Sequence, residues 1–373
     1  MRERSVEFDE FLSFLSEEAA KTSERDFTRS TRAAVSAAGR DTLFFGQLEK
    51  ALAKTFKDKL PVPKAAKPKK KSPIDRILNV VLSDTHYGSD LDPREVGTKY
   101  GPREEIRRTA SIIKQVADYK RQYREHTKLY VHALGDLFQG ALHDPREGVP
   151  LAQQICQTIY IMVRALRYLA AEFPRGVVVF CATGNHGRRT ERHLNRAIQQ
   201  KWDSNETIVY FALKTALANV KNVEVRLNYA PFYEFDVFGR KGVGTHGDTY
   251  LKPGFPGSTI ETKSLKTQIA NLNHGRILKG LKPFELVVVG HVHTGSMTHV
   301  AKNCTLVTNG PLVPPDAYAI SSGYGDTACG QWIWESTARY IKGDARFAEV
   351  DEETDADATL DSILGEPFSG IDQ

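Results

Sequence analysis

Five short motifs of this chain are rich in histidine, aspartate and asparagine, and each follows a run of apolar residues. Imidazole nitrogens and carboxylate oxygens together are typical ligands of Mn, Fe, Zn or Ni rather than of a calcium cage. The motifs are Asp84-Thr85-His86, Gly135-Asp136, Gly184-Asn185-His186, Gly244-Thr245-His246-Gly247-Asp248 and Gly290-His291-Val292-His293. They supply seven nitrogen or oxygen ligands and one further histidine, which is enough to hold two metal ions.

Short β-rich runs alternate with helical patterns from residue 77 onward, which indicates an α/β domain. Strands are predicted at 77–82, 129–134, 177–181, 223–227, 233–237, 243–245, 286–289 and 305–308, and helices at 104–124, 150–172 and 258–279. We further expect a turn at 239–242, an ordered loop over 310–330 and a last strand or hairpin within 338–350. Because ligands bind outside the carboxyl ends of strands in such sheets, the motifs are expected to meet at one edge.

The spacing inside the motifs supports this expectation. Asp84 and His86 are two residues apart, and so are His291 and His293. In an extended segment, side chains two residues apart point the same way. The glycines before Asp136, Asn185 and His291 allow tight turns in which backbone and substrate approach closely.

As an ordered set, the motifs resemble the calcineurin-like metallophosphoesterase superfamily, which contains protein phosphatases, purple acid phosphatases, cyclic nucleotide phosphodiesterases and the Mre11/SbcD nucleases. The resemblance covers roughly residues 77–310. It implies an α/β fold in which a two-sheet β-sandwich is flanked by helices, and a phosphoester hydrolase with two divalent metal ions. Two cations about 3.5–4 Å apart can clamp an in-line displacement, with a metal-bridging hydroxide as the nucleophile.

Carried over by motif, the resemblance implies a role for each motif residue. The first metal would be held by Asp84, His86 and His293. Asp136 would bridge both metals. The second metal would be held by Asn185, His246 and His291. His186 would lie over the scissile phosphate as the catalytic residue and protonate the leaving oxygen. Mn is the expected metal, with Zn, Fe or Ni as alternatives.

One position departs from the family pattern. Family members commonly carry Asp or Glu directly after Gly-Asn-His, where this chain has Gly187. Such an acid can orient the histidine, so a distant carboxylate would have to substitute for it. Asp248, two residues beyond His246, is the candidate partner that the sequence offers.

Side chains next to the motifs indicate substrate contacts. Arg188 and Arg189 directly follow the Gly-Asn-His turn, and guanidinium groups suit phosphate recognition. Tyr87 and His143 flank other motifs and are expected to contact a base or a ribose.

The choice of substrate follows from finer resemblances. The segments 84–88 and 135–138 resemble the Mre11/SbcD-type nuclease branch, and the whole chain resembles phosphoesterases of tailed phages. We therefore expect a phosphodiesterase or nuclease that acts on DNA. Two alternatives stay open: a phosphatase or phosphodiesterase for a small nucleotide or phosphoprotein, and a DNA- or partner-binding module with a degenerate metal site.

Composition divides the chain into four parts: a small helical N-terminal arm at 1–60, a linker at 61–74, the metallophosphoesterase domain at 75–350 and an acidic flexible tail at 351–373. The linker holds four prolines and five lysines. These lysines could contact nucleic-acid phosphates, and a solvated linker is the alternative.

The overall composition favours a cytoplasmic protein, in the host cytoplasm if the chain is phage-encoded. No apolar stretch approaches the ~20 residues of a membrane span, and residues 1–10 lack the apolar core of a signal peptide. The four cysteines are widely spaced, which fits a reducing compartment. We expect no membrane partner, and the sequence carries no indication of oligomeric state.

Overall fold

The computed structural model of the chain describes residues 75–122, 128–142, 148–188, 201–254, 260, 262–301, 303–321, 323 and 327–350. The chain divides into two units, Met1–Lys50 and Ala51–Gln373, and every described residue belongs to the second. The predicted arm, linker and acidic tail therefore lie outside the described residues.

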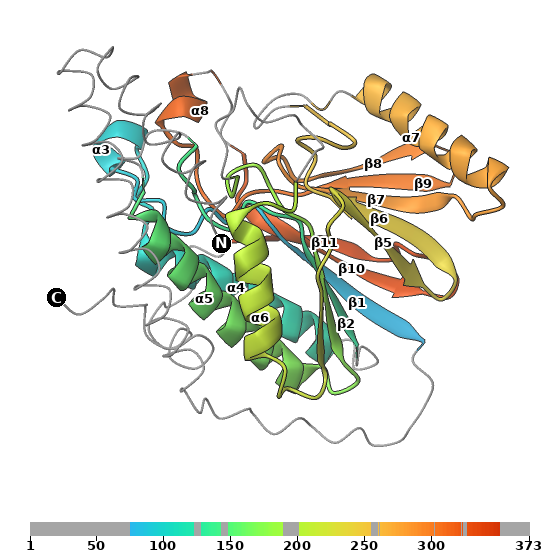
Figure 1. Cartoon of the computed structure of the whole chain (residues 1–373), viewed down its shortest axis with the longest axis horizontal. Helices are drawn as coiled ribbons and strands as arrows, with labels where there is room; N and C mark the ends of the chain where they lie inside the picture. The colour runs from blue at the N-terminus through green and yellow to red at the C-terminus, as the bar shows by residue number, and fades with distance from the viewer. Residues whose placement is uncertain are drawn as a thin grey trace, which may run out of the picture. The chain divides into compact units, whose positions relative to one another are not determined.

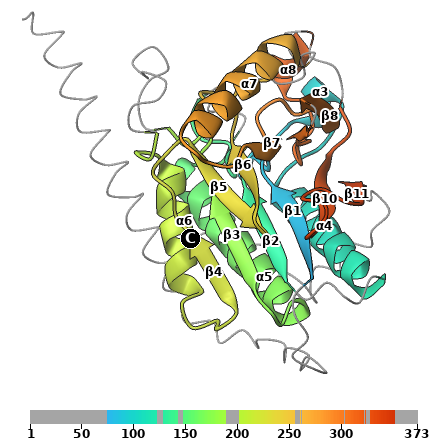
Figure 2. The same cartoon turned by 90° about the vertical axis from the view of Figure 1, so that its right-hand side faces the viewer.

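Two β-sheets flanked by helices make up the described part of the chain (Figures 1 and 2). The strands are β1 (Arg76–Leu82), β2 (Leu129–Ala133), β3 (Val177–Cys181), β4 (Val223–Arg226), β5 (Phe232–Val237), β6 (Arg240–Thr245), β7 (Phe284–Val289), β8 (Ser296–Ala301), β9 (Cys304–Thr308), β10 (Gly330–Thr337) and β11 (Ala345–Glu349). The first sheet has the order β11-β10-β1-β2-β3-β4, and the second has the order β5-β6-β7-β9-β8. The predicted fold class, an α/β protein with two sheets flanked by helices, is confirmed.

Parallel pairing brings the carboxyl ends of the motif strands to a common edge in each sheet. β1, β2, β3 and β4 run parallel in the first sheet, and β6, β7 and β9 run parallel in the second. β10 and β11 extend the first sheet by antiparallel pairing, and β5 and β8 border the second in the same way. Each sheet thus ends in a set of loops that can hold ligands.

Hydrophobic side chains fill the space between the two sheets. On β5, burial alternates so that Tyr233, Phe235 and Val237 are buried while the residues between them are exposed. This period of two turns one face of the strand toward the first sheet, where Phe180 and Trp334 lie in the same core cluster. β1, β2 and β3 are buried almost throughout, because helices cover their other face.

Helices cover the outer faces of both sheets (Figure 1). Three of them, α4 (Pro102–Gln122), α5 (Leu151–Glu172) and α6 (Asn205–Ala216), pack against the first sheet, and α7 (Thr262–Leu278) packs against the second. Two shorter helices, α3 (Pro93–Val96) and α8 (Ala317–Ser321), lie in loops. The N-cap residue of α6 is Ser204, whose side chain accepts a hydrogen bond from the backbone N–H of Glu206.

Several sequence predictions need correction. The sequence does not predict α3, α6, α8, β8 or β10. The turn predicted at 239–242 lies at residues 238–239 instead, because β6 begins at Arg240. Gly242 favours a turn in the sequence, but it lies in β6. Glycine is needed there because the ring of Phe235 occupies the space that a side chain would fill. A Cβ added at Gly242 would lie 2.2 Å from Phe235 Cζ.

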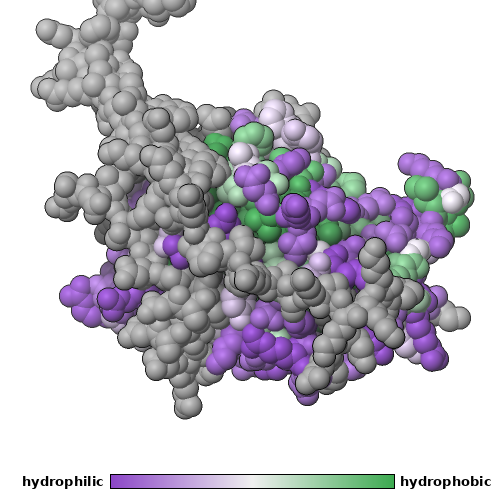
Figure 3. Space-filling view, turned by 90° about the horizontal axis from the view of Figure 1, so that it is seen from below, coloured by the Kyte–Doolittle hydropathy of each residue, from purple (hydrophilic) through white to green (hydrophobic). Residues whose placement is uncertain are grey.

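Among the described helices, none has both the length and the apolar character that a membrane span requires. On the face seen in Figure 3, the hydrophobic residues gather mainly in one area, and hydrophilic residues border it.

Candidate dimetal site

The predicted ligands meet where the strands of the two sheets end. Three groups have ligand atoms that all lie within 4.8 Å of one another: Asp84, His86 and His293; His86, Asp136 and His186; and Asp136, His246 and His291. The seventh predicted ligand, Asn185, joins them through a 3.0 Å contact between its Oδ1 and His246 Nε2. The shared members connect the groups into one site, as the strand ends predict.

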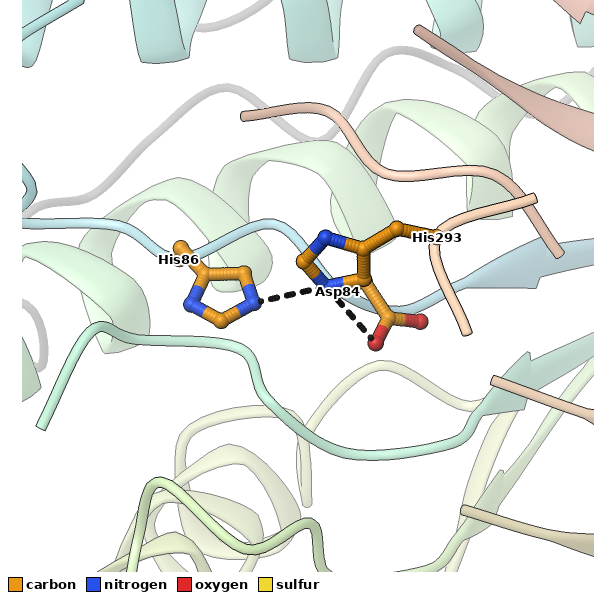
Figure 4. Close-up of side chains that lie close together, drawn as sticks. All are labelled: Asp84, His86 and His293. Carbon is orange, nitrogen blue, oxygen red and sulfur yellow. Dashed lines mark hydrogen bonds and ion pairs between the residues drawn. The ribbon is translucent and has the colours of Figure 1, made fainter. Parts of the chain in front are cut away.

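The first group contains Asp84, His86 and His293, whose side chains point toward one another (Figure 4). His293 Nε2 lies 3.2 Å from His86 Nε2 and 3.5 Å from Asp84 Oδ1. His86 Nδ1 lies 2.9 Å from Oε1 of Gln139, so Nδ1 donates and Nε2 carries the lone pair. Burial and the neighbouring His186 hold the pKa of His86 well below its usual value. A neutral His86 therefore presents Nε2 as a ligand atom.

The third group, Asp136, His246 and His291, is built around His246, which is fully buried. Its Nδ1 donates to the backbone carbonyl of Leu134 at 2.8 Å. Its Nε2 faces Asp136 Oδ2 at 2.9 Å and Asn185 Oδ1 at 3.0 Å. In a neutral His246, three lone pairs would converge there without a proton, which is the arrangement that a cation satisfies.

The pKa values of this group support that reading. Burial lowers the pKa of His246, but the charge and hydrogen bond of Asp136 outweigh burial and raise it to about 9. In the absence of a metal ion, a proton on His246 Nε2 therefore supplies the positive charge that a cation would supply there. Burial and the neighbouring His246 lower the pKa of His291 to about 3, so its ring is neutral and can offer a lone pair to a cation. The donor set therefore fits two divalent cations.

The backbone is strained at most of these ligands. Among the described residues, seven non-glycine residues have positive φ, and five of them are predicted ligands: Asp84, His86, Asp136, His291 and His293. Each such residue costs about 1–3 kcal/mol and is common at functional sites. The expectation that Asp84 and His86 share a face because their segment is extended is therefore wrong. Left-handed turns, at φ of 53° and 47°, aim these side chains into the site.

Gly184 shows how closely the motif loops approach. A Cβ at this position would lie 2.0 Å from Asp136 Oδ1 and 2.4 Å from the Asp136 backbone nitrogen. The same Asp136 Oδ1 accepts a hydrogen bond from the backbone N–H of His186 at 2.8 Å. The predicted role of the motif glycine in close approach is confirmed here.

His186 is oriented by a residue that sequence reasoning missed. Its Nδ1 donates to the backbone carbonyl of Gln139 at 2.6 Å, and its ring centroid lies 4.5 Å from that of His86. Gln139 thus binds His86 through its side chain and His186 through its backbone. Its only signal in the sequence is its position three residues after Asp136.

The residues predicted to contact substrate differ in where the structure places them. Arg188 Nε donates to the backbone carbonyl of Asn185 at 2.9 Å, so this guanidinium braces the loop of the Gly-Asn-His motif. Tyr87 is 1% exposed and its hydroxyl lies 2.7 Å from Thr109 Oγ1, so its ring belongs to the interior and is not retained as a substrate contact. Arg189 and His143 lie outside the described residues.

Asp248 contacts the site through a lysine. Its Oδ2 accepts a hydrogen bond from Lys201 Nζ at 2.6 Å, and the same Nζ donates to the Gly184 carbonyl at 2.9 Å. Asp248 therefore reaches the backbone of the Gly-Asn-His loop, and the contacts described for it do not include His186.

No family model matches the chain, and neither does any curated protein. Solved structures similar to the chain include a dimetal phosphatase from Danio rerio, with 10% identity and a TM-score of 0.35 over 75% of this chain and 100% of that one. A metallophosphoesterase from Sphaerobacter thermophilus matches with 14% identity and a TM-score of 0.26, over 80% of this chain and 96% of that one. A 5′-nucleotidase from Candida albicans matches with 11% identity and a TM-score of 0.32, over 81% of this chain and 56% of that one. These values are too low to transfer a function, so the chemistry is inferred from the side chains of the site.

Proposed function

We propose that the protein is a dimetal-dependent phosphoester hydrolase. The supporting observation is the convergence of His246 Nε2, Asp136 Oδ2 and Asn185 Oδ1 within about hydrogen-bond distance, beside the group that contains Asp84 and His86. Two divalent cations held by these residues would polarise a phosphoryl oxygen and supply an activated water.

The chain's own residues orient the reacting groups. The bond from His186 Nδ1 to the Gln139 carbonyl fixes the plane of the ring and its tautomer. Nε2, on the other side of the ring, faces the reacting groups. In the imidazolium form, which carries a proton on each nitrogen, Nε2 can give its proton to the leaving oxygen or donate a hydrogen bond to a phosphoryl oxygen. His86 and Asp136, whose ligand atoms lie within 4.8 Å of His186, place this ring beside the metal ligands.

The first experiment uses a model ester. Protein loaded with Mn²⁺ is expected to hydrolyse bis-p-nitrophenyl phosphate, and His186→Ala is expected to lower kcat by roughly 10²–10⁴-fold. Metal content, measured by mass spectrometry of the desalted protein, should stay unchanged, because His186 is not a ligand in this proposal. His274→Ala, at an exposed position on α7, is the matched control. Full turnover by metal-free wild-type protein would contradict the proposal.

For the substrate, we propose phosphodiesters of DNA. Trp202 and Tyr229 are 46% and 71% exposed, and their ring centroids lie 6.1 Å apart. Trp202 follows Lys201, whose carbonyl accepts a hydrogen bond from Thr183 Oγ1 beside the Gly-Asn-His loop. Exposed aromatic rings next to a phosphate-cleaving site suit stacking of bases, which tolerates any sequence. The lysines at 64–71 would add charge for the backbone.

The second experiment tests this substrate class. Trp202→Ala is expected to lower kcat/KM on single-stranded DNA by roughly 5- to 100-fold, the value of one stacked base, with a smaller effect on the model ester. Phe211→Ala, which removes an exposed aromatic ring from α6, is the matched control. The values of kcat/KM for single-stranded DNA, duplex DNA, cyclic nucleotides and nucleotide monophosphates then show which substrate class is preferred. Preference for monophosphates would overturn the DNA proposal in favour of a phosphatase.

A further inference from the structure

Glu206, in the first turn of α6, is a fully buried acid between two loops of the site. Its Oε1 accepts a hydrogen bond from the backbone N–H of Leu137 at 2.8 Å, and its Oε2 accepts one from the backbone N–H of Gly184. Leu137 directly follows Asp136, and Gly184 directly precedes Asn185. One carboxylate therefore ties together the loops that present these two predicted ligands.

The Glu206 side chain also occupies the space next to Gly187. A Cβ at Gly187 would lie 2.8 Å from Glu206 Cγ and 2.6 Å from Ser204 Oγ. Gly187 is not among the glycines with positive φ, so crowding rather than backbone conformation disfavours a side chain there. The Gly187 carbonyl accepts a hydrogen bond from the Asn205 N–H at 2.8 Å, which holds the start of α6 against this loop.

We propose that Glu206 is a positioning residue of the site: from α6 it fills the space beside Gly187 and holds the loops of Asp136 and Asn185 together. Bonds from N–H groups to a carboxylate are shorter and stronger than neutral ones, so Glu206 holds Asp136 and Asn185 at the separation that His246 Nε2 bridges. Asp248 does not take this role, because its Oδ2 binds Lys201. The role in metal binding rests on the proposed function, whereas the filling of space at Gly187 is independent of it.

Glu206→Gln tests the positioning role with little change of shape. One oxygen becomes an NH₂ group that faces a backbone N–H, so one loop loses its acceptor. We expect the affinity for Mn²⁺, measured by calorimetric titration, to fall by roughly 10–100-fold, and saturating Mn²⁺ to restore most of the turnover. Ser204→Ala is the control: it removes the cap of α6 and lowers the Tm, but it leaves Mn²⁺ affinity unchanged. Wild-type affinity in Glu206→Gln would overturn the role.

A double-mutant cycle tests the shared space. Ser204→Ala is present in both backgrounds, because Ser204 Oγ would crowd the new side chain as well. Gly187→Ala should then lower the Tm of the metal-free protein when Glu206 is present and lower it much less in a Glu206→Ala background, where Cγ is gone. Equal losses in both backgrounds would overturn the proposal. If the wild-type protein bound no Mn²⁺, the proposed function would fail, and this cycle would still decide whether Glu206 fills the space beside Gly187.

Discussion

Two fully buried histidines, His132 between the sheets and His246 at the site, show how the core and the site differ. His132 Nδ1 lies 2.8 Å from the Tyr233 hydroxyl and its Nε2 lies 3.3 Å from Asn79 Oδ1, so one nitrogen accepts and the other donates. Both ring nitrogens of His246 instead face oxygen atoms that can only accept. A neutral histidine satisfies the core, whereas the site requires an additional positive charge.

Electrostatics follows the same division. Burial alone lowers the pKa of His132 to about 3, whereas at His246 the influence of Asp136 overcomes burial and the pKa rises to about 9. Five of the seven described non-glycine residues with positive φ are predicted ligands, and none of the seven lies in a described strand. Equal burial thus stabilises the core in one region, whereas in the other it surrounds the atoms that the proposed function assigns to metal binding, at a cost in backbone strain.

The largest expected effect is a loss of Mn²⁺ affinity when the charge next to His246 is removed, as it is absent next to His132. Asp136→Asn removes the charge that favours a cation beside His246, so Mn²⁺ affinity should fall by more than the roughly 10–100-fold that loss of a supporting residue costs. In the wild-type protein, Mn²⁺ at 100 times its Kd should raise the free energy of unfolding by about 2.7 kcal/mol. Thermal unfolding with and without Mn²⁺ measures both effects. Asp118→Asn, at an exposed position on α4, is the control, and equal stabilisation of Asp136→Asn by Mn²⁺ would contradict the prediction.

An intermediate effect concerns the core histidine and pH. Because the pKa of His132 is about 3 in the folded protein and about 6.5 when unfolded, the unfolded chain takes up the proton first as pH falls. This contribution to stability is present above pH ~6.5 and is lost toward pH ~3, by about 2 kcal/mol between pH 7 and pH 5. Urea denaturation at several pH values measures it.

The matching variant is His132→Phe, which keeps a ring against Phe180 and Trp334 but cannot be protonated. It should be less stable at pH 7, because Asn79 and Tyr233 lose a partner, and its stability should depend less on pH. An unchanged pH dependence would show that another group is responsible.

The smallest expected effect separates the two contacts that Gln139 makes within the site. Gln139→Met removes the acceptor of His86 Nδ1 and leaves the backbone carbonyl that binds His186. Mn²⁺ affinity should fall roughly tenfold, because the His86 tautomer is no longer held, while kcat at saturating Mn²⁺ stays near the wild-type value. A loss of kcat without a loss of affinity would reverse these assignments.

Much of the fold could be predicted because it depends on local pattern. Apolar runs such as Val177–Cys181 and Leu286–Val289 indicate buried strands, and the predicted ligands follow within a few residues. β10 was missed because its residues follow a loop rich in glycine and proline, and its place beside β1 depends on pairing with residues far along the chain. Tyr87 was misjudged because nearness to a motif in the sequence does not show which way a ring points.

The sequence alone was enough to predict the types of the candidate ligands, their order and their positions after strands, since these depend on residues close together along the chain. Only the tertiary structure decided which atoms face one another. The Leu134 and Gln139 carbonyls select the tautomers of His246 and His186, and Glu206 reaches Leu137 across 69 positions. Such contacts arise from the packing of α6 and the two sheets, which no local periodicity encodes.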